Sequence, residues 1–174
     1  MSDGKAKLIH TQEMPVWRRV NRATHEARLI ADRHYNRQKV GSPQFVPPGR
    51  CAVFLVPSAL WVTSWPYAQY TKHAWAGAWV NSCFRKEVED GDASAYIRSA
   101  VAATRTIWEP PELGMITFVD PQHVKPTRRR GRDIYGYAYL KAGFNHVGFT
   151  KGGLWAWQLL PADMPEPGCL VPYE

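Results

Sequence analysis

The sequence predicts a single α+β domain. Short apolar runs that end at Gly, Pro, Asn or Asp recur along the chain, and such runs are typical of strands. Other stretches carry apolar residues at helical spacing or end at a glycine, which is typical of helices. With 174 residues the chain has the length of one domain and is large enough to bury most of its apolar surface.

The N-terminal part begins with a loose lead or a short first strand over residues 1–14. A polar helix with one apolar side is expected over roughly Asn21–Tyr35. The segment Gly41–Gly49 follows, and its prolines cannot continue a helix. His34 and Tyr35 therefore lie at a helix end that leads into an ordered loop, where both side chains can face a cleft.

The middle of the chain predicts three strands and the longest helix. Residues 50–57 and 59–65 are apolar runs joined by Pro-Ser, which suits a hairpin. Residues 74–85 are expected to form the next strand, with Gly77 marking a bulge or a close backbone approach. After an acidic turn, a helix capped by its first residue is expected over residues 92–108. Its apolar positions share one face, which we expect to pack on a sheet: Ile97, Ala100, Val101, Thr104 and Trp108.

The stretch Leu113–Gly153 combines strand, basic loop, helix and strand. An apolar run, Met115–Val119, ends at Asp120-Pro121, as a buried strand ends at a turn. A basic loop, Lys125–Arg132, follows and leads to a helix over Asp133–Ala142.

The remainder continues the sheet. Gly143 stops the predicted helix, and Phe144 begins a second β run. A last strand is expected over Leu154–Leu160. Residues 161–174 carry four prolines and are expected to lie over the surface as a tail.

Composition points to an anionic partner. The net charge is +7, which makes nucleic acid the first candidate and a phosphate-bearing cofactor the second, with simple solubility as the alternative. Eight Trp and eight Tyr supply core volume or flat faces for stacking on bases. Cys51, Cys83 and Cys169 show no ligand spacing, which favours a reducing cytoplasm over a disulfide framework or a zinc site. No run approaches the about 18 apolar residues of a membrane helix, and the first residues lack a signal-peptide core.

The stretch Tyr139–Phe144 (YLKAGF), followed by NHVGFTKGG, resembles the GCN5-related N-acetyltransferase family, in which the last helix ends in Tyr-x-x-x-Gly-Phe. Tyr139, Gly143 and Phe144 stand at the matching positions. The resemblance implies a mixed, mostly antiparallel central sheet flanked by helices, an acetyl-CoA or related acyl-CoA donor, and a tyrosine that protonates the departing thiolate. The junction Arg85–Ser94 departs from the family's glycine-rich loop, and its three acidic residues would repel a pyrophosphate.

Within this fold the chain is most similar to the Mom-type phage DNA-modification enzymes, which alter the N6 amine of adenine. The matching residues, over about residues 25–155, are His34-Tyr35, Arg85, Ala93-Ser94, Asp120-Pro121 and Tyr139. The resemblance implies a phage- or prophage-borne transferase with an anti-restriction role in the host cytoplasm, acting on DNA. It also implies iron, for which His34, His73, His123 and His146 are available, although no spacing supports a metal site.

Three residues are expected to carry the chemistry. His34 is the candidate general base or ligand, because imidazole titrates near neutrality. Asp120 would accept a hydrogen bond from the amine or orient His34. Tyr139 would act as the acid and share one helix face with Tyr135, whereas Tyr137 points across.

The binding roles follow from charge and stacking. Tyr35 would stack on a flipped base or donate a hydrogen bond to it. The phosphate-binding candidates are Arg128, Arg129, Arg130 and Arg132. The cofactor-binding candidates are Arg85, Ser94 and Tyr135.

Each role has a plain alternative. His34 also suits a helix cap beside a packed tyrosine, Asp120 a turn, Ser94 a cap, and the arginines a solvated loop. Competing functions are an acyltransferase for a small amine or a protein, and a non-catalytic nucleic-acid binder. The transferred group, the preferred DNA strand state, the metal requirement and the oligomeric state, a homodimer included, stay open.

Overall fold

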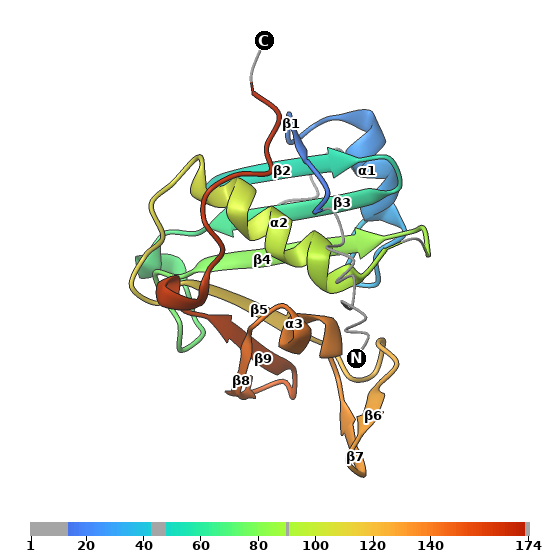
Figure 1. Ribbon diagram of the computed structural model, residues 1–174, viewed down its shortest axis with the longest axis vertical. Coiled ribbons are helices and arrows are strands. Elements are labelled where there is room, and N and C mark those ends of the chain that lie inside the picture. The colour runs from blue at the N-terminus through green and yellow to red at the C-terminus, as the bar shows by residue number, and fades with distance from the viewer. Residues whose placement is uncertain (1–13, 43–47, 90, 173–174) are drawn as a thin grey trace, which may run out of the picture.

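A seven-stranded mixed sheet forms the body of the protein (Figure 1). The computed structural model describes residues 14–42, 48–89 and 91–172. In spatial order the strands are β1 (Arg18–Val20), β2 (Arg50–Val56), β3 (Ala59–Trp65), β4 (Trp79–Lys86), β5 (Met115–Val119), β9 (Trp155–Leu159) and β8 (Asn145–Phe149). The helices are α1 (His25–Asp32), α2 (Ala93–Arg105) and α3 (Tyr137–Lys141), with short 3-10 turns η1 (Ala68–Tyr70) and η2 (Pro161–Asp163).

All neighbouring strands of this sheet run antiparallel except β4 and β5, which are parallel and are connected through α2. A parallel pair needs such a crossover, because the chain must return to the same end of the sheet. The predicted α+β class with a mostly antiparallel sheet is therefore confirmed.

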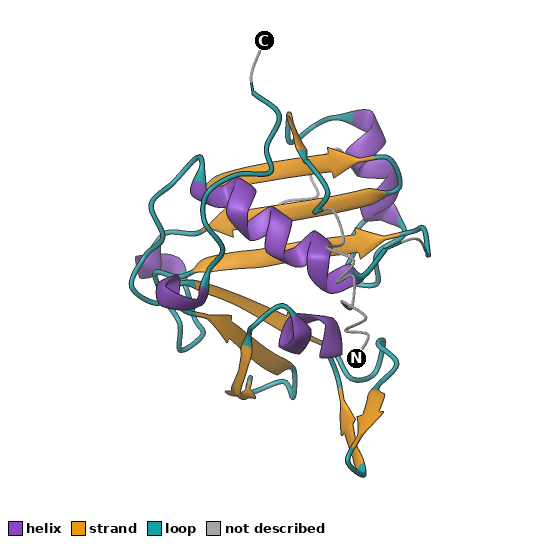
Figure 2. Ribbon diagram, viewed as in Figure 1, coloured by secondary structure: helices purple, strands orange, loops and turns teal. Residues whose placement is uncertain are grey.

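The two faces of the sheet are covered by different helices, because side chains alternate along each strand. On β2, Phe54 packs in the cluster beneath α2, whereas its neighbours Val53 and Leu55 pack against α1. Figure 2 shows α2 crossing one face of the sheet, with α1 on the other side.

The buried side of α2 is the predicted one, since Ile97, Ala100, Val101 and Thr104 are all fully buried. Burying one side chain of the size of Ile97 stabilises the fold by about 1.5–3 kcal/mol. The helix begins at Asp92, whose carboxylate accepts a hydrogen bond from the Ser94 N–H, so the predicted cap is confirmed.

The hairpin predicted for residues 50–65 is also confirmed. β2 and β3 pair in register from Arg50 with Trp65 to Val56 with Ala59, and Ser58 adopts a positive φ of 63° in the turn. A proline that cannot donate a hydrogen bond and a residue in the left-handed region together end the first strand.

Several predicted elements are shorter in the structure. The helix expected over residues 92–108 ends at Arg105, so Trp108 lies beyond it. The expected strand over residues 74–85 begins only at Trp79, because residues 75–78 form turns and Gly77 has a φ of +99°. The helix expected over Asn21–Tyr35 is confined to α1, since Asn21 and Ala23 form a turn held by the Asn21 side chain.

The basic stretch is a hairpin rather than a loop. β6 (Thr127–Arg129) and β7 (Arg132–Ile134) pair antiparallel and project from the body at the bottom of Figure 1. Arg130 and Gly131 both have positive φ, 51° and 75°, which is the backbone of a tight two-residue hairpin turn.

The helix expected over Asp133–Ala142 is correspondingly short. Asp133 and Ile134 belong to β7, and Gly136, at a φ of +98°, separates that strand from α3. Gly143 ends the helix as predicted.

The C-terminal tail lies over α2. Gly168 donates a hydrogen bond to the Ala102 carbonyl, and Arg105 donates one to Pro165. Leu170 pairs with Trp17 next to β1, so the tail ties the first strand to the helix layer. The prediction for residues 1–13 lies outside the described residues. Within the described ranges, no helix has the length and apolar character needed to cross a membrane.

Candidate active site

A cavity opens where β4 and β5 part. The two strands pair only over residues 79–81 and 115–117, so the carboxyl end of each strand is free of the other. The cavity between them has a volume of about 410 Å³, which falls in the range of small-molecule sites. The opening therefore arises because the parallel strands β4 and β5 separate after three paired residues.

A bulge in β4 shapes one wall. Val62 of β3 pairs with Cys83 and Thr63 pairs with Asn81, so Ser82 is an extra residue on β4. Bulges of this kind bend a strand and often lie beside functional sites. Here the bulge turns residues 81–84 along the cavity.

The lining comes from segments far apart in the sequence. The loop after α1 contributes His34, Tyr35 and Asn36, and α2 contributes its cap Asp92. The strands β4 and β5 contribute residues 81–84 and 117–119. The remaining wall consists of Val124, Lys125, Thr127, Gly136, Tyr137, Ala138, Tyr139 and Lys141.

Tyr139 joins a buried polar network. Its hydroxyl donates a hydrogen bond to Asn81 Oδ1 at 2.6 Å, and the Thr117 hydroxyl donates to the oxygens of the same asparagine at 3.1 and 3.2 Å. Burial raises the pKa of Tyr139 well above its ordinary value, and hydrogen bonding by Thr117 only partly opposes that rise. The phenol is therefore neutral at physiological pH.

The end of α3 explains how Tyr139 is aimed. Phe144 donates its N–H to the Tyr139 carbonyl, and Gly143 donates to the Leu140 carbonyl, which is the Schellman arrangement. Gly143 has a φ of +100°, and the rings of Tyr139 and Phe144 meet edge to face at 5.3 Å. The Tyr-x-x-x-Gly-Phe pattern thus describes a helix end that holds the tyrosine against the core.

His34 lies in the cavity wall as a neutral imidazole. Its Nδ1 accepts a hydrogen bond from the Asn36 N–H at 3.2 Å. Burial lowers the pKa of His34, and hydrogen bonds to Asn36 and to the Phe84 backbone partly oppose this. A neutral ring suits a base, but its contacts to Asn36 and Phe84 also match the capping alternative.

Tyr35 already has two stacking partners. Its ring lies 4.5 Å from that of His34 and 5.3 Å from that of His123, with an angle of only 3° to the latter. Its hydroxyl accepts a hydrogen bond from the Asp120 N–H at 3.4 Å. These contacts make Tyr35 part of the wall, and the residue remains 40% exposed.

Asp120 lies behind this stack rather than in the cavity lining. Its carboxylate accepts from the Gln122 N–H and contacts His123 Nδ1, each at 2.9 Å. Those two bonds, the Gln122 bond first, hold the pKa of Asp120 below its usual value. Asp120 therefore pairs with His123, not with His34 as expected.

Arg85 is held outside the cavity. Its Nε lies 2.9 Å from Glu87, which also accepts two hydrogen bonds from Arg33. Hydrogen bonding to Arg33, followed by Arg85, lowers the pKa of Glu87 to about 2. The ion cluster neutralises Glu87, one of the acidic residues of this junction, and Arg85, the expected cofactor-binding residue, lies outside the cavity lining with its Nε paired to that carboxylate.

The start of α2 already holds an anion. Asp92 accepts from the Ser94 N–H at 2.9 Å and from Lys141 Nζ at 2.5 Å, and hydrogen bonding to Lys141 is the main cause of its lowered pKa. A helix start binds phosphate through the same free N–H groups. Ser94 is engaged in the cap, so this end does not fit the diphosphate of an acyl-CoA.

Tyr137 lines the cavity, whereas Tyr135, which was expected to line it, does not. Tyr135 precedes α3 and packs on Trp155 with ring centres 5.4 Å apart, outside the cavity lining. Tyr137 lines the cavity instead, with Arg129 stacked over its ring at 4.9 Å. The helix begins two residues later than Tyr135, so the expected shared face does not form.

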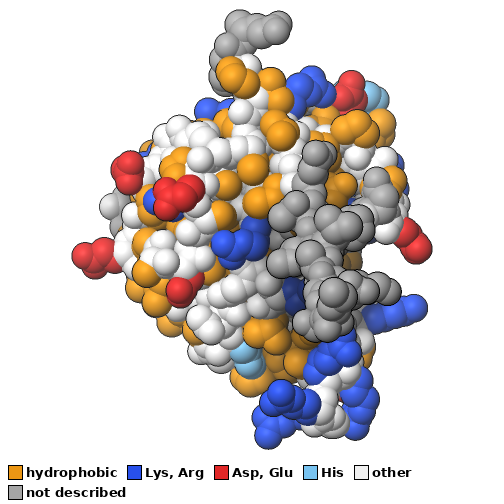
Figure 3. All heavy atoms as spheres, viewed as in Figure 1, with side chains coloured by type: hydrophobic (Ala, Val, Ile, Leu, Met, Phe, Trp, Pro, Cys, Tyr) orange, Lys and Arg blue, Asp and Glu red, His pale blue; other side chains and the backbone are white. Residues whose placement is uncertain are grey.

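The arginine hairpin continues from the cavity rim. Lys125 and Thr127 line the cavity just before Arg128, Arg129, Arg130 and Arg132, and Tyr137 lines it just after them. Arg128 pairs with Asp133 at 3.1 Å, and both side chains are well exposed. Figure 3 shows Lys and Arg side chains gathered over this hairpin.

Several cavity residues were not anticipated. They are Asn81, Thr117 and Lys141, which carry polar groups in the lining. Asparagine within an apolar strand sequence is the signal that could have found Asn81, since strands disfavour asparagine. Thr117 carries no such signal, because threonine is common in strands. Cys83 also lines the cavity, but burial raises the pKa of its thiol to about 12, which excludes a thiolate nucleophile at neutral pH.

Among the residues that the structure describes, no group of three His, Cys, Asp or Glu side chains is placed to hold a metal ion, so the site does not fit iron. No family model, no curated protein and no solved structure matches this chain.

Proposed function

We propose that the protein is a Mom-type transferase of the GCN5-related fold that modifies the exocyclic N6 amine of adenine in DNA. The observation that carries the proposal is the continuity of a base-sized cavity with an arginine hairpin. Cavity residues stand immediately before and after the hairpin strands, so a strand gripped by the arginines presents its bases at the opening.

The cavity suits a base removed from its stack. Enzymes that act on a base in DNA must extrude it into a pocket and surround it with aromatic and hydrogen-bonding groups. The walls here provide Tyr137 as a flat aromatic surface, and Asn81, Thr117 and Tyr139 as polar groups.

The fold proposal has separate support. The mostly antiparallel sheet flanked by helices and the Tyr139–Phe144 helix end agree with what the sequence resemblance implies. The acyl donor is the weakest match, because Asp92 occupies the start of α2. The residues of this chain hold the DNA and the base.

The test uses DNA from cells that express the protein. Nucleosides digested from that DNA are expected to contain a new adenine derivative by mass spectrometry, absent from cells that express the Tyr139→Phe variant. If the wild-type protein is soluble and yet yields no new nucleoside, the proposed reaction is refuted.

A non-catalytic DNA binder is the second candidate, favoured by the occupied helix start and the engaged His34. Such a binder would show salt-sensitive DNA binding but would produce no new nucleoside in the digested DNA. An acyltransferase for a small amine or a protein differs in its expected outcome, since it requires acyl-CoA binding but no salt-sensitive DNA binding.

A further inference from the structure

The inference concerns what Tyr139 can offer a ligand, and it rests on the proposed function. Its starting point is Asn81, a buried asparagine at the β4 bulge that is only 5% exposed. The Asn81 Nδ2 donates to the Val62 carbonyl at 3.1 Å and to the Cys83 carbonyl at 3.0 Å. Rotating the amide by half a turn would direct Oδ1 at two carbonyl oxygens, so the orientation of Asn81 is determined by the backbone.

Because the amide orientation is determined, Asn81 Oδ1 can only accept. The Tyr139 oxygen lies 2.6 Å from it, and the phenol has a single proton. That proton must therefore point to Asn81. The raised pKa of Tyr139 agrees with a phenol that keeps this proton.

The consequence is a cavity wall with a defined polarity. Tyr139 lines the cavity beside Thr117, and with its proton directed to Asn81 its oxygen can only accept further hydrogen bonds. A ligand group at this point must bring an N–H or O–H, and a carbonyl oxygen there would face another acceptor. An unmatched buried polar group is costly, so this contact discriminates among bases.

We propose that Tyr139 accepts a hydrogen bond from the exocyclic amine of the target base, and that Asn81 is the positioning residue that makes it an acceptor. The site therefore selects amino-bearing bases such as adenine against purine, which lacks the amine, and against hypoxanthine, which carries an oxygen there. Tyr139 orients the amine in the bound state and is not the proton donor of that state.

The test measures binding of short duplexes with one base opposite an abasic site, by fluorescence anisotropy at low salt. Wild-type protein is expected to bind the adenine duplex about tenfold more tightly than the purine duplex. Tyr139→Phe removes the acceptor and is expected to bring the ratio near one. Tyr135→Phe, the same change at a tyrosine outside the cavity lining, is the matched control and retains the ratio.

Asn81→Ala tests the positioning role through the base preference, which the loss of a merely structural residue would not change. It releases the Tyr139 proton, so the preference is expected to shift toward hypoxanthine, whose oxygen accepts. If this variant does not fold, the adenine-to-purine affinity ratios of the wild-type and Tyr139→Phe proteins are sufficient to test the proposal.

Two results would overturn the inference. One is a wild-type protein that binds DNA in a salt-dependent manner but treats adenine and purine alike, which leaves the proposed function standing. The other is a Tyr139→Phe protein with the wild-type ratio. Absence of binding to every duplex would instead refute the proposed function itself.

Discussion

Salt dependence offers a direct test of the arginine hairpin. We consider the double variant Arg130→Asn/Arg132→Gln. Arg128 and Arg129 stay in place with their contacts to Asp133 and Tyr137. Asparagine tolerates the positive φ of Arg130, and Asn-Gly is a favoured pair for such a turn, so the hairpin is preserved.

The expected magnitude follows from counterion release. If each of the four hairpin arginines neutralises one phosphate, the slope of log affinity against log salt is about −3.6, because each contact contributes about −0.9. Between 50 and 200 mM salt that slope corresponds to a loss of affinity of about 150-fold. With two contacts removed, the slope becomes about −1.8 and the loss about 12-fold.

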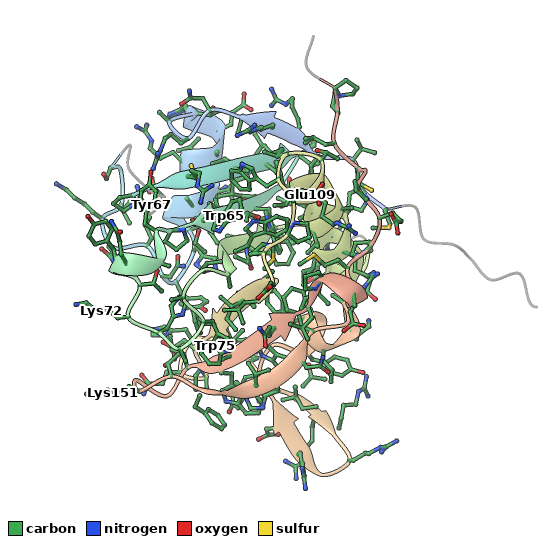
Figure 4. The ribbon with its side chains drawn as sticks, turned by 90° about the vertical axis from the view of Figure 1, so that its left-hand side faces the viewer. Trp65, Tyr67, Lys72, Trp75, Glu109 and Lys151 are labelled. Atoms are coloured by element: carbon green, nitrogen blue, oxygen red, sulfur yellow. The ribbon has the colours of Figure 1, made fainter. Side chains whose placement is uncertain are left out.

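The assay is fluorescence anisotropy with a labelled duplex over that salt range. The matched control, Lys72→Gln/Lys151→Gln, lowers the net charge by the same amount at exposed positions away from the hairpin, both labelled in Figure 4. Its slope is expected to stay near that of the wild-type protein. Equal slopes for the wild-type protein and the hairpin variant, or an equal drop in the control, would refute a phosphate-binding hairpin.

Three further predictions concern stability and protonation. Gly143→Ala places a Cβ at a φ of +100° and 3.2 Å from Arg98, so we expect the free energy of unfolding to fall by about 1–2 kcal/mol and the Tm by about 2–8 °C. Gly152→Ala is the control and should change neither quantity, because its Cβ meets only an ordinary contact at 3.9 Å. Glu87→Gln removes a carboxylate whose pKa in the folded protein is about 2, below its ordinary 4.5. A carboxylate with a lowered pKa stabilises the folded state at any pH above its unfolded-state pKa. The wild-type protein should therefore exceed the variant in free energy of unfolding near neutral pH, and chemical denaturation should show this difference shrinking as the pH falls from about 4.5 toward about 2. His34 is expected to titrate below its ordinary pKa of 6.5 in an NMR pH series, and a higher value would contradict a neutral imidazole in the cavity wall.

Much of the fold was predictable because its signals are local. The turn at Pro57-Ser58 and the spacing of the apolar residues of α2 each depend on a few neighbouring residues. The hairpin at Arg130-Gly131 was missed because arginine-rich strands lack the apolar alternation by which strands are recognised, and only the two positive φ angles reveal the turn.

The candidate site was predictable in part. His34, Tyr35 and Tyr139 do line one cavity, because a helix end before a Pro-rich segment and a helix end at a glycine both place side chains at an edge. Arg85, Ser94, Tyr135 and Asp120 lie outside the cavity lining. The cap that engages Ser94 was predictable, whereas the ion pair of Arg85, the ring contact of Tyr135 and the His123 partner of Asp120 are contacts that a sequence pattern does not reveal.

The sequence by itself determined the class of the fold, the capped central helix and the glycine stop after Tyr139, since these depend on propensity and spacing along the chain. Only the tertiary structure decided what Tyr139 contacts. Asn81 lies 58 residues earlier, on a strand whose bulge and whose parting from β5 arise from pairing with other strands. A hydrogen bond between distant residues depends on how the sheet is assembled, so the acceptor character of the cavity wall is a property of the assembled sheet.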